Sequence, residues 1–583
     1  MFTEYEKVFI NKWFALLVTL ALMAIVILPG PLNFSQTFFL AHDYPFDYKN
    51  LMHLYVSEST GRISSFAFIS LLPNIVLSKL SSFFGVYAQT FLIKILPYFI
   101  FTYFYLRKLI KDNYVKLNNW QDCVYVFGIY FLITLGLNNQ MAINTGFFFN
   151  ILYQFNFYLF LFHATLYIYD SEVIHKNSFK LLTFLLFESS ILLGSIFIPI
   201  TIYLAIIYCK AFLEIFNKRY TTEIALVFFS VVTMYFLLKI HGISLLTNFD
   251  ETNNFELNRS YQAIKGGYFY QFIGFSNWGI YTGWSDRIFG GFTHFFSNPI
   301  FQASLFSLNA LSLYYFLKQK KYFLVLILII FLVLSVGDQA PFGFLYVFLL
   351  ENVPGFASIR TPDNKFGVFI QGILLLNLLL AITRFKVREK AYIVLLLIGA
   401  LIFLIPPLLT GKTVFGLKSI YSSKSTYILE SQGELKMAAQ LSSNDFVLLI
   451  PGAGNFDHPS GRVGPIDPMP HYIDHYVSYA AVIEDIHSPY SHYLNRKAQV
   501  IPPEINAVIY RKSFSKFDKY DWASHGFYKV YEDEYSILYK KASEPKVPVY
   551  SKYFLAYIIA ATSFLYLSLL YLLIKYVRST STI

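Results

Sequence analysis

Two carboxylates stand in a polar segment that follows the first long apolar stretch of the chain. Asp43 and Asp47 are four residues apart in the run Ala-His-Asp-Tyr-Pro-Phe-Asp-Tyr-Lys. At a membrane surface, one such carboxylate could take the proton of an attacking hydroxyl group as a general base. The alternative is a solvated loop whose acids pair with Lys49 or Arg62. Spacing alone favours that alternative, because paired acids near a helix end are common.

Two cations, Arg360 and Lys365, stand immediately before another apolar stretch. Cations on the outer side of a membrane are disfavoured as orientation signals, so another use is plausible for them. A guanidinium group suits bidentate recognition of phosphate, and a lysine adds a point charge. The alternative is contact with lipid headgroups by snorkelling side chains. The residues alone leave both interpretations open.

Other polar and aromatic residues gather in a long segment between apolar stretches. They are candidates for substrate binding because aromatic rings beside polar groups suit stacking against sugars. The candidates are Arg259, Trp278, Trp284, Asp286, Arg287 and His294. Tryptophan near a membrane surface is more often a belt residue, and that interpretation is favoured here.

A histidine pair near the C-terminus invites a metal interpretation. His471 and His475 are four residues apart with Asp474 between them, so they could share one face of a helix. No glutamate follows His471 as it would in a zinc protease, and Pro468 and Pro470 interrupt the lead-in. Structural or surface histidines are therefore favoured. The sequence also carries no P-loop, nucleophile elbow or dinucleotide-binding fingerprint.

The composition shows what must position these groups. Of 583 residues, 56% are hydrophobic and 14% are charged, against about 25% charged in a soluble domain. Stretches of roughly 18–25 apolar residues match the thickness of a bilayer. The sequence predicts a polytopic α-helical membrane protein of about twelve spans. The spans are expected at residues 13–30, 87–106, 121–138, 147–169, 180–194, 196–213, 222–240, 299–317, 322–336, 364–383, 391–410 and 552–576.

The net charge of +11 does not indicate nucleic-acid binding, because the basic residues form short clusters between apolar stretches. With twelve spans and a cytoplasmic N-terminus, every cluster falls on the cytoplasmic side. The clusters are Lys7 and Lys12; Arg107, Lys108, Lys111 and Lys116; Lys210, Lys218 and Arg219; Lys318, Lys320 and Lys321; and Arg384, Lys386, Arg388 and Lys390. Loops 31–86, 241–298 and 337–363 and the segment 411–551 are then extracytoplasmic.

Three parts of the chain follow: a membrane domain over 1–410, a soluble α/β domain over 411–551, and a terminal helix with a cytoplasmic tail over 552–583. In the soluble part we expect a helix over 430–441, a strand over 445–451 and a hairpin around Glu532. Its lack of cysteine excludes an internal disulfide. Two finer predictions concern the membrane domain. Residues 63–84 form an interfacial or re-entrant helix pair, and 180–213 fold as a two-helix hairpin.

The motifs resemble those of GT-C glycosyltransferases. An acid outside the first span, followed by glycine and proline in an apolar stretch, resembles their first outer loop. A second run resembles a segment shared by arabinofuranosyltransferases of the mycobacterial cell-envelope type and by YfhO-like membrane glycosyltransferases. The residues that carry the resemblance are Asp43, Gly61, Pro73 and Gly85, and then Gly337, Ala340, Pro341, Val353–Phe356, Ile359–Pro362, Lys365 and Phe366.

The resemblance implies an enzyme that moves a sugar from a polyprenyl-phosphate donor to an extracytoplasmic glycan, lipid or protein acceptor in cell-envelope assembly. It implies that Asp43 is the general base, with Asp47 as substitute, and that Arg360 and Lys365 hold the donor phosphate. The spacing of the two aspartates departs from Asp-x-Asp, so a requirement for a divalent metal stays open. The sequence has no Trp-Trp-Asp run, which disfavours an oligosaccharyltransferase.

Two other function classes compete with this interpretation. A transporter or flippase of lipid-linked saccharides would carry ionisable groups within its spans and paired repeats. Here Glu188 is the main acid within a span, and no repeat is evident. A non-catalytic scaffold would use the soluble domain to bind partners, and the sequence excludes it poorly.

Overall fold

The computed structural model describes a helical body and a mixed sheet. Short pieces and single positions, such as Ile359 and Met469, supplement the main ranges. The main ranges are residues 3–27, 37–39, 96–137, 150–170, 172–209, 218–240, 267–275, 293–353, 362–409, 427–429, 432–442, 445–450, 456–458, 461–463, 476–479, 505–513, 521–542 and 552–581. The expected helix pair at 63–84 lies mostly outside the described residues.

A helix overlaps each of the twelve apolar stretches expected from the sequence. Among the described helices, six are long and apolar enough to cross a membrane, namely α1, α8, α18, α21, α22 and α25. The chain is therefore a helical membrane protein, whereas its span count and orientation stay predictions. The twelve helices are α1 (Glu4–Ile27), α5 (Leu96–Lys111), α6 (Trp120–Leu135), α8 (Ile151–Tyr169), α9 (Asn177–Ile191), α10 (Phe197–Tyr208), α12 (Thr221–Ile240), α18 (Pro299–Lys318), α19 (Tyr322–Ser335), α21 (Pro362–Leu380), α22 (Val387–Leu409) and α25 (Lys552–Ser581).

Helix α21 is the centre of the helical body. It packs against α6, α8, α18 and α19, and 89% of its apolar core is buried. Gly372 lets α8 approach closely, since a Cβ there would lie 3.2 Å from the Leu161 side chain. Asn377 donates to the Ser312 carbonyl of α18 over 2.8 Å, and the Ser312 hydroxyl donates to the Leu374 carbonyl over 2.6 Å. Such interhelical hydrogen bonds fix neighbours that apolar packing alone leaves free to slide.

The stretch 180–213 forms two helices rather than one, as expected. α9 ends at Ile191 and α10 begins at Phe197, and the two helices pack together. Gly194 between them has a positive φ of 44°, which favours glycine, and Pro199 stands in the first turn of α10. The predicted hairpin is confirmed.

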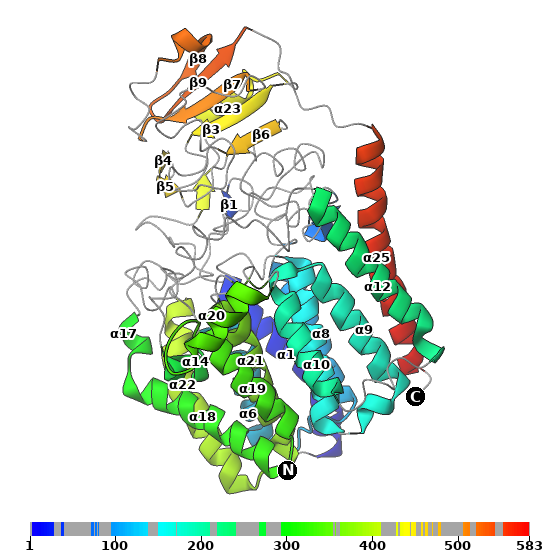
Figure 1. The fold of residues 1–583 in the computed structure, drawn as a ribbon. Helices are drawn as coiled ribbons and strands as arrows, with labels where there is room; N and C mark the ends of the chain where they lie inside the picture. The colour runs from blue at the N-terminus through cyan, green and yellow to red at the C-terminus, as the bar shows by residue number, and fades with distance from the viewer. Residues whose placement is uncertain are drawn as a thin grey trace.

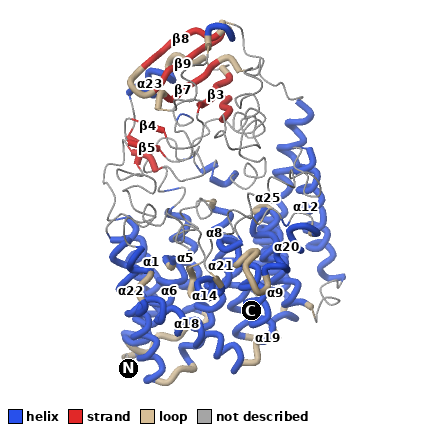
Figure 2. Tube along the Cα trace, turned by 60° about the vertical axis from the view of Figure 1, so that its left-hand side comes forward, coloured by secondary structure: helices blue, strands red, loops and turns tan. Residues whose placement is uncertain are grey.

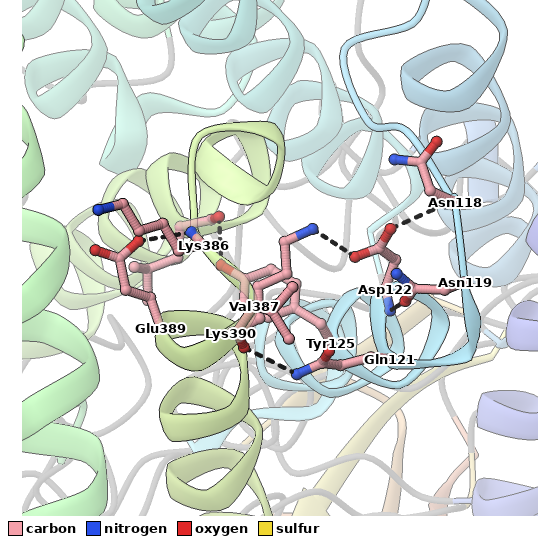
Figure 3. A network of polar contacts seen from close by, with 10 residues as sticks. Asn118, Asn119, Gln121, Asp122, Tyr125, Lys386, Val387, Glu389 and Lys390 are labelled. Atoms are coloured by element: carbon pink, nitrogen blue, oxygen red, sulfur yellow. Dashed lines mark hydrogen bonds and ion pairs between the residues drawn. The ribbon is translucent and has the colours of Figure 1, made fainter. Parts of the chain in front are cut away.

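A buried ion pair ties α6 to α22 at the end of the body away from the sheet. Asp122 is fully buried, and Lys390 donates to its Oδ1 over 2.6 Å. The Asn118 amide donates to Oδ2 over 2.9 Å, and Asn119 caps α6 by accepting from the Asp122 amide over 2.8 Å (Figure 3). A buried charge is tolerated when it is paired and hydrogen-bonded in this way.

Glu188 ties the last helix to the body. It lies fully buried in α9, and its Oε1 accepts hydrogen bonds of 2.6 Å from Ser230 of α12 and from Ser568 of α25. Lys575 of α25 also pairs with buried Glu223 of α12. Figure 1 shows α25 running alongside α12. The Oε1 atom of Glu188 therefore links three helices, whereas its Oε2 atom has no hydrogen-bond partner among the described residues.

The C-terminal part contains a five-stranded mixed sheet with strand order β6-β3-β7-β9-β8. β3 runs parallel to β6 and β7, whereas β9 runs antiparallel to β7 and β8. The expected hairpin is β8–β9, and the expected helix and first strand are α23 (Gln432–Ala438) and β3. The strands are β3 (Phe446–Ile450), β6 (Tyr476–Tyr479), β7 (Ala507–Arg511), β8 (Phe527–Glu532) and β9 (Ser536–Lys541). That residues 411–551 form an independent domain stays a prediction.

Two polar networks hold this sheet. Arg511 of β7 is fully buried and donates to Glu434 of α23 over 2.5 Å and to Ser536 of β9 over 2.6 Å. Asp445 accepts from the Ser442 amide and the Asn506 amide group over 2.7 Å each, and pairs with Lys540 over 2.7 Å. These networks fasten α23 and its following loop to β7 and β9.

A second, small sheet joins distant parts of the chain. β1 (Thr37–Phe39), which lies in the first outer loop, pairs antiparallel with β2 (Tyr427–Leu429). A further pair is β4 (Phe456–His458) with β5 (Gly461–Val463). Figures 1 and 2 show the five-stranded sheet beyond one end of the helical body, with both termini near the other end. β1 and the five-stranded sheet therefore lie toward the same end of the helical body.

We expect the stability of the sheet to fall below about pH 4 because of Asp445. Burial alone would raise the pKa of this carboxyl, but hydrogen bonds from Lys540, Ser442 and Asn506 together hold its pKa below the usual value. An acid with a lowered pKa stabilises the fold above its unfolded pKa, and that stabilisation is lost as pH falls through the folded pKa.

Hydrogen exchange of the β3 and β7 amides, followed from pH 6 to pH 3, measures this dependence. Asp445→Asn should be less protected than wild type at pH 6 and should lose the fall attributed to this carboxyl. Exposed Glu534→Gln is the control and should match wild type. Equal acid sensitivity of wild type and Asp445→Asn would contradict the assignment.

We also expect Glu188→Gln to keep the fold, because the carbonyl oxygen of a glutamine can accept hydrogen bonds from both serine hydroxyls. Glu188→Leu removes both hydrogen bonds, so it should cost about 1–2 kcal/mol of stability. Each membrane hydrogen bond contributes about 0.6 kcal/mol, and the two buried serine hydroxyls each lose a partner at a further cost. Thermal unfolding in detergent measures the difference. Ser190→Ala is the control, since Ser190 bonds to the Phe187 carbonyl of its own helix. A Glu188→Gln protein that unfolds at the same temperature as Glu188→Leu would contradict the role given to these two hydrogen bonds.

Candidate functional site

The beginning of α21 carries two buried ionisable residues. Asp363 is 0% exposed and Lys365 is 4% exposed, and both have interaction partners. An acid in the first turn of a helix is favourable because it faces the positive end of the helix dipole. A lysine there is unfavourable on the same ground, and its burial adds a further cost. Lys365 is therefore the residue at this end whose position calls for an anionic neighbour.

The segment that leads into α21 is fixed by a short helix, α20 (Gly343–Asn352). Tyr346 of α20 is fully buried and donates to the Ile359 carbonyl over 2.6 Å. The Tyr346 ring also packs edge-on against Phe356, with centroids 5.4 Å apart. Ile359 itself is buried. Arg360 follows Ile359 in the chain and lies outside the described residues.

Neutral polar groups gather along the same half of α21. Asn309 of α18 and Gln371 of α21 both donate to the Phe272 carbonyl, over 2.6 and 2.9 Å. Phe272 ends the short helix α14 (Tyr268–Phe272), and Gly274 follows it with a positive φ of 89°. Gln271 is fully buried, and neither side-chain amide atom has a hydrogen-bond partner among the described residues. Polar groups buried at membrane depth point to a site or a water path.

A small hollow lies beside this cluster. It is lined by Gly136, Gly274, Gln371 and apolar residues of α6, α18 and α22, and its volume is about 30 Å³. This volume admits one or two water molecules and is far too small for a sugar.

Two outer loops meet at α14. Tyr268 donates to the Gln339 carbonyl over 3.5 Å, and its hydroxyl accepts from the Phe342 amide over 3.3 Å. Tyr268 belongs to the loop 241–298, whereas Gln339 and Phe342 belong to the loop 337–363. The structure thus brings these two segments together at the end of the body from which α21 begins.

The contacts described above do not include the remaining candidate residues from the sequence. His294 lies in the short helix α17 (Thr293–Phe296), and its side chain lies outside the described residues. The residues outside the described ranges are Asp43, Asp47, Arg259, Trp278, Trp284, Asp286 and Arg287, and also His471, Asp474 and His475. Within the described ranges, no three His, Cys, Asp or Glu side chains gather as metal ligands.

Sequence reasoning missed Asp363 and the polar cluster of Gln271, Asn309 and Gln371. A signal was present, because an amide in an apolar helix is costly in a bilayer and so marks a contact. It also missed α20, whose ten residues are too short to stand out from the loop 337–363 as a span.

No protein-family model and no curated protein matches the sequence. The fold is similar to a cryo-electron microscopy structure of the arabinofuranosyltransferase AftD from Mycobacteria, with a TM-score of 0.51 and 11% sequence identity. The similarity covers 92% of this chain and 40% of that chain, so this chain spans less than half the length of AftD. The chain therefore has a GT-C-like fold, the fold class that its motifs resemble.

Proposed function

We propose that this chain is a membrane glycosyltransferase that transfers a sugar from a polyprenyl-phosphate donor to an extracytoplasmic glycan, lipid or protein acceptor. The observation that carries the proposal is the charged beginning of α21 within a GT-C-like fold. Buried Lys365 lies there. In the sequence, Arg360 follows Ile359, whose carbonyl accepts a hydrogen bond from Tyr346. A lysine and an arginine at one helix end suit a phosphate, the group by which such a donor holds its sugar.

The pairing of β1 with β2 supports a role for Asp43. Asp43 is four positions after Phe39, so its Cα atom can lie no farther than about 14 Å from that of Phe39. β1 lies between the five-stranded sheet and the helical body in Figure 1. The end of the body from which α21 begins faces the same way. β1 therefore lies toward the end of the body from which α21 begins, as a convergence of Asp43 with Arg360 and Lys365 requires.

The proposed reaction inverts the configuration of the sugar. An acceptor hydroxyl oxygen forms a bond to the anomeric carbon while the bond from that carbon to the donor phosphate oxygen breaks. Asp43 takes the hydroxyl proton, with Asp47 as the substitute base, and polyprenyl phosphate leaves with the bonding electrons. Arg360 and Lys365 stabilise the charge that develops on the phosphate.

In this proposal the outer loops supply contacts to the substrates. Loop 241–298, which Tyr268 ties to loop 337–363, supplies Arg259, Trp278, Trp284, Asp286, Arg287 and His294 as candidates for sugar or acceptor contacts. In the proposed orientation the N-terminus is cytoplasmic and the sheet extracytoplasmic, in the cell membrane of an organism that assembles its envelope from lipid-linked sugars. A flippase would move the intact donor instead of cleaving it.

We expect Asp43→Asn to lower the turnover of polyprenyl phosphate release by about 10²–10⁴-fold, the usual contribution of a general base. Asp47→Asn should have a smaller effect unless Asp47 is the base. Mass spectrometry of lipid extracted from the purified wild-type protein identifies the donor for this assay. Turnover equal to wild type in both variants would remove the proposed base. Movement of intact donor across vesicles without cleavage would instead support the flippase.

We expect Arg360→Gln and Lys365→Met to weaken binding of the polyprenyl-phosphate carrier, because each removes one positive charge from the phosphate site. The loss should be about 10- to 100-fold in Kd for each, as for a charge-assisted hydrogen bond worth 1.5–3 kcal/mol. Arg388→Gln, which changes an exposed cation at the start of α22, is the matched control. Affinity unchanged in both variants, with the fold intact, would count against this site.

A further inference from the structure

The exposed face of α20 is strongly apolar. Phe344 is 64% exposed, Phe348 57% and Leu345 41%, and these three residues form a stripe along one side of the helix. Phe342, directly before the helix, is 46% exposed. The opposite side of α20 packs into the protein through Gly343 and Tyr346, which are buried. The helix has one charged residue, Glu351, in its last turn.

α20 begins and ends at the same end of the helical body. Phe331, near the end of α19, packs against Phe366, near the beginning of α21, with ring centroids 5.3 Å apart. Ser335 and Pro362, the ends that flank α20, therefore lie at one end of the body. Ten residues of helix extend about 15 Å, half of the roughly 30 Å that a hydrocarbon core requires. α20 therefore cannot be a membrane span.

The surroundings of α20 identify what covers its apolar stripe. The helix packs against α19, whose exposed residues Leu326 and Ile329 are also apolar. α19 has no charged residue, and its composition is that of a membrane helix. The stripe thus adjoins a surface that itself belongs in lipid. Three phenylalanines and a leucine facing water would be an unusually apolar patch for so short a helix.

We infer that α20 is an interfacial helix whose stripe of Phe344, Leu345 and Phe348 inserts into the membrane leaflet at the end of the body that faces the sheet. Its partner is the phospholipid bilayer. The buried side holds the Ile359 carbonyl through Tyr346, so lipid contact on one side sets the depth of the segment entering α21 on the other. This inference stands without the proposed sugar transfer, because it concerns the surface alone.

Site-directed spin labelling in phosphatidylcholine nanodiscs tests the inference. The native thiols, Cys123 and Cys209, are first replaced by alanine. Labels are then attached to the substitutions Phe344→Cys, Leu345→Cys and Phe348→Cys. Glu534→Cys, which lies exposed between β8 and β9, is the control for exposure to water. Collision with dissolved oxygen reports exposure to lipid, and collision with a neutral nickel chelate reports exposure to water.

Labels at 344, 345 and 348 should collide several-fold more with oxygen than with the chelate, and the label at 534 should show the reverse order. Chelate access at 344 and 348 equal to that at 534 would overturn the inference. Shielding from both reagents would overturn it as well, since a protein partner would then cover the stripe. The unmodified protein gives a second measurement, because a diazirine-bearing phosphatidylcholine should label peptide 342–348. Labelling of α22 is the positive control. If α22 is labelled and peptide 342–348 is not, the result counts against the inference.

Discussion

The low dielectric of a bilayer governs this molecule, because a charge inside the helical body must find a partner there. Asp122 forms an ion pair with Lys390, and Glu188 accepts hydrogen bonds from two serine hydroxyls on two other helices. Asp122 is thereby paired, whereas the Oε2 atom of Glu188 has no hydrogen-bond partner among the described residues. Lys365 differs from them because a cation at the positive end of a helix is opposed by the helix itself.

The helical body and the sheet use the same physical means at different depths. In the body, amide and hydroxyl groups such as Asn377 and Ser312 bond to backbone carbonyls of neighbouring helices. In the sheet, buried Arg511 bonds to Glu434 and Ser536 and so fixes α23 on the strands. In each case a polar residue selects one arrangement from the many that apolar packing would accept.

The sequence predicted the elements better than the contacts. Hydropathy alone located a helix in each of the twelve apolar stretches, and alternation located the β8–β9 hairpin, since both signals are local. It did not predict α20, which is too short for a span pattern, or the cluster of Gln271, Asn309 and Gln371, which forms from three separate helices. Pairing of β1 with β2 was equally hidden, because nothing near Thr37 specifies a partner near Leu429. Of the site itself, the sequence located the charged beginning of α21, and the fold comparison agrees with the GT-C-like resemblance.

The β1–β2 pairing also sets the order of assembly. Its two strands are separated by about 390 residues, so this pairing has an exceptionally high contact order. β1 is synthesised and delivered to its side of the membrane long before β2 exists. A nascent chain therefore lacks the strand that would hold its first loop until nearly all of the polypeptide has been made. Prematurely terminated products would carry every residue of that loop and still lack the strand that pairs with β1.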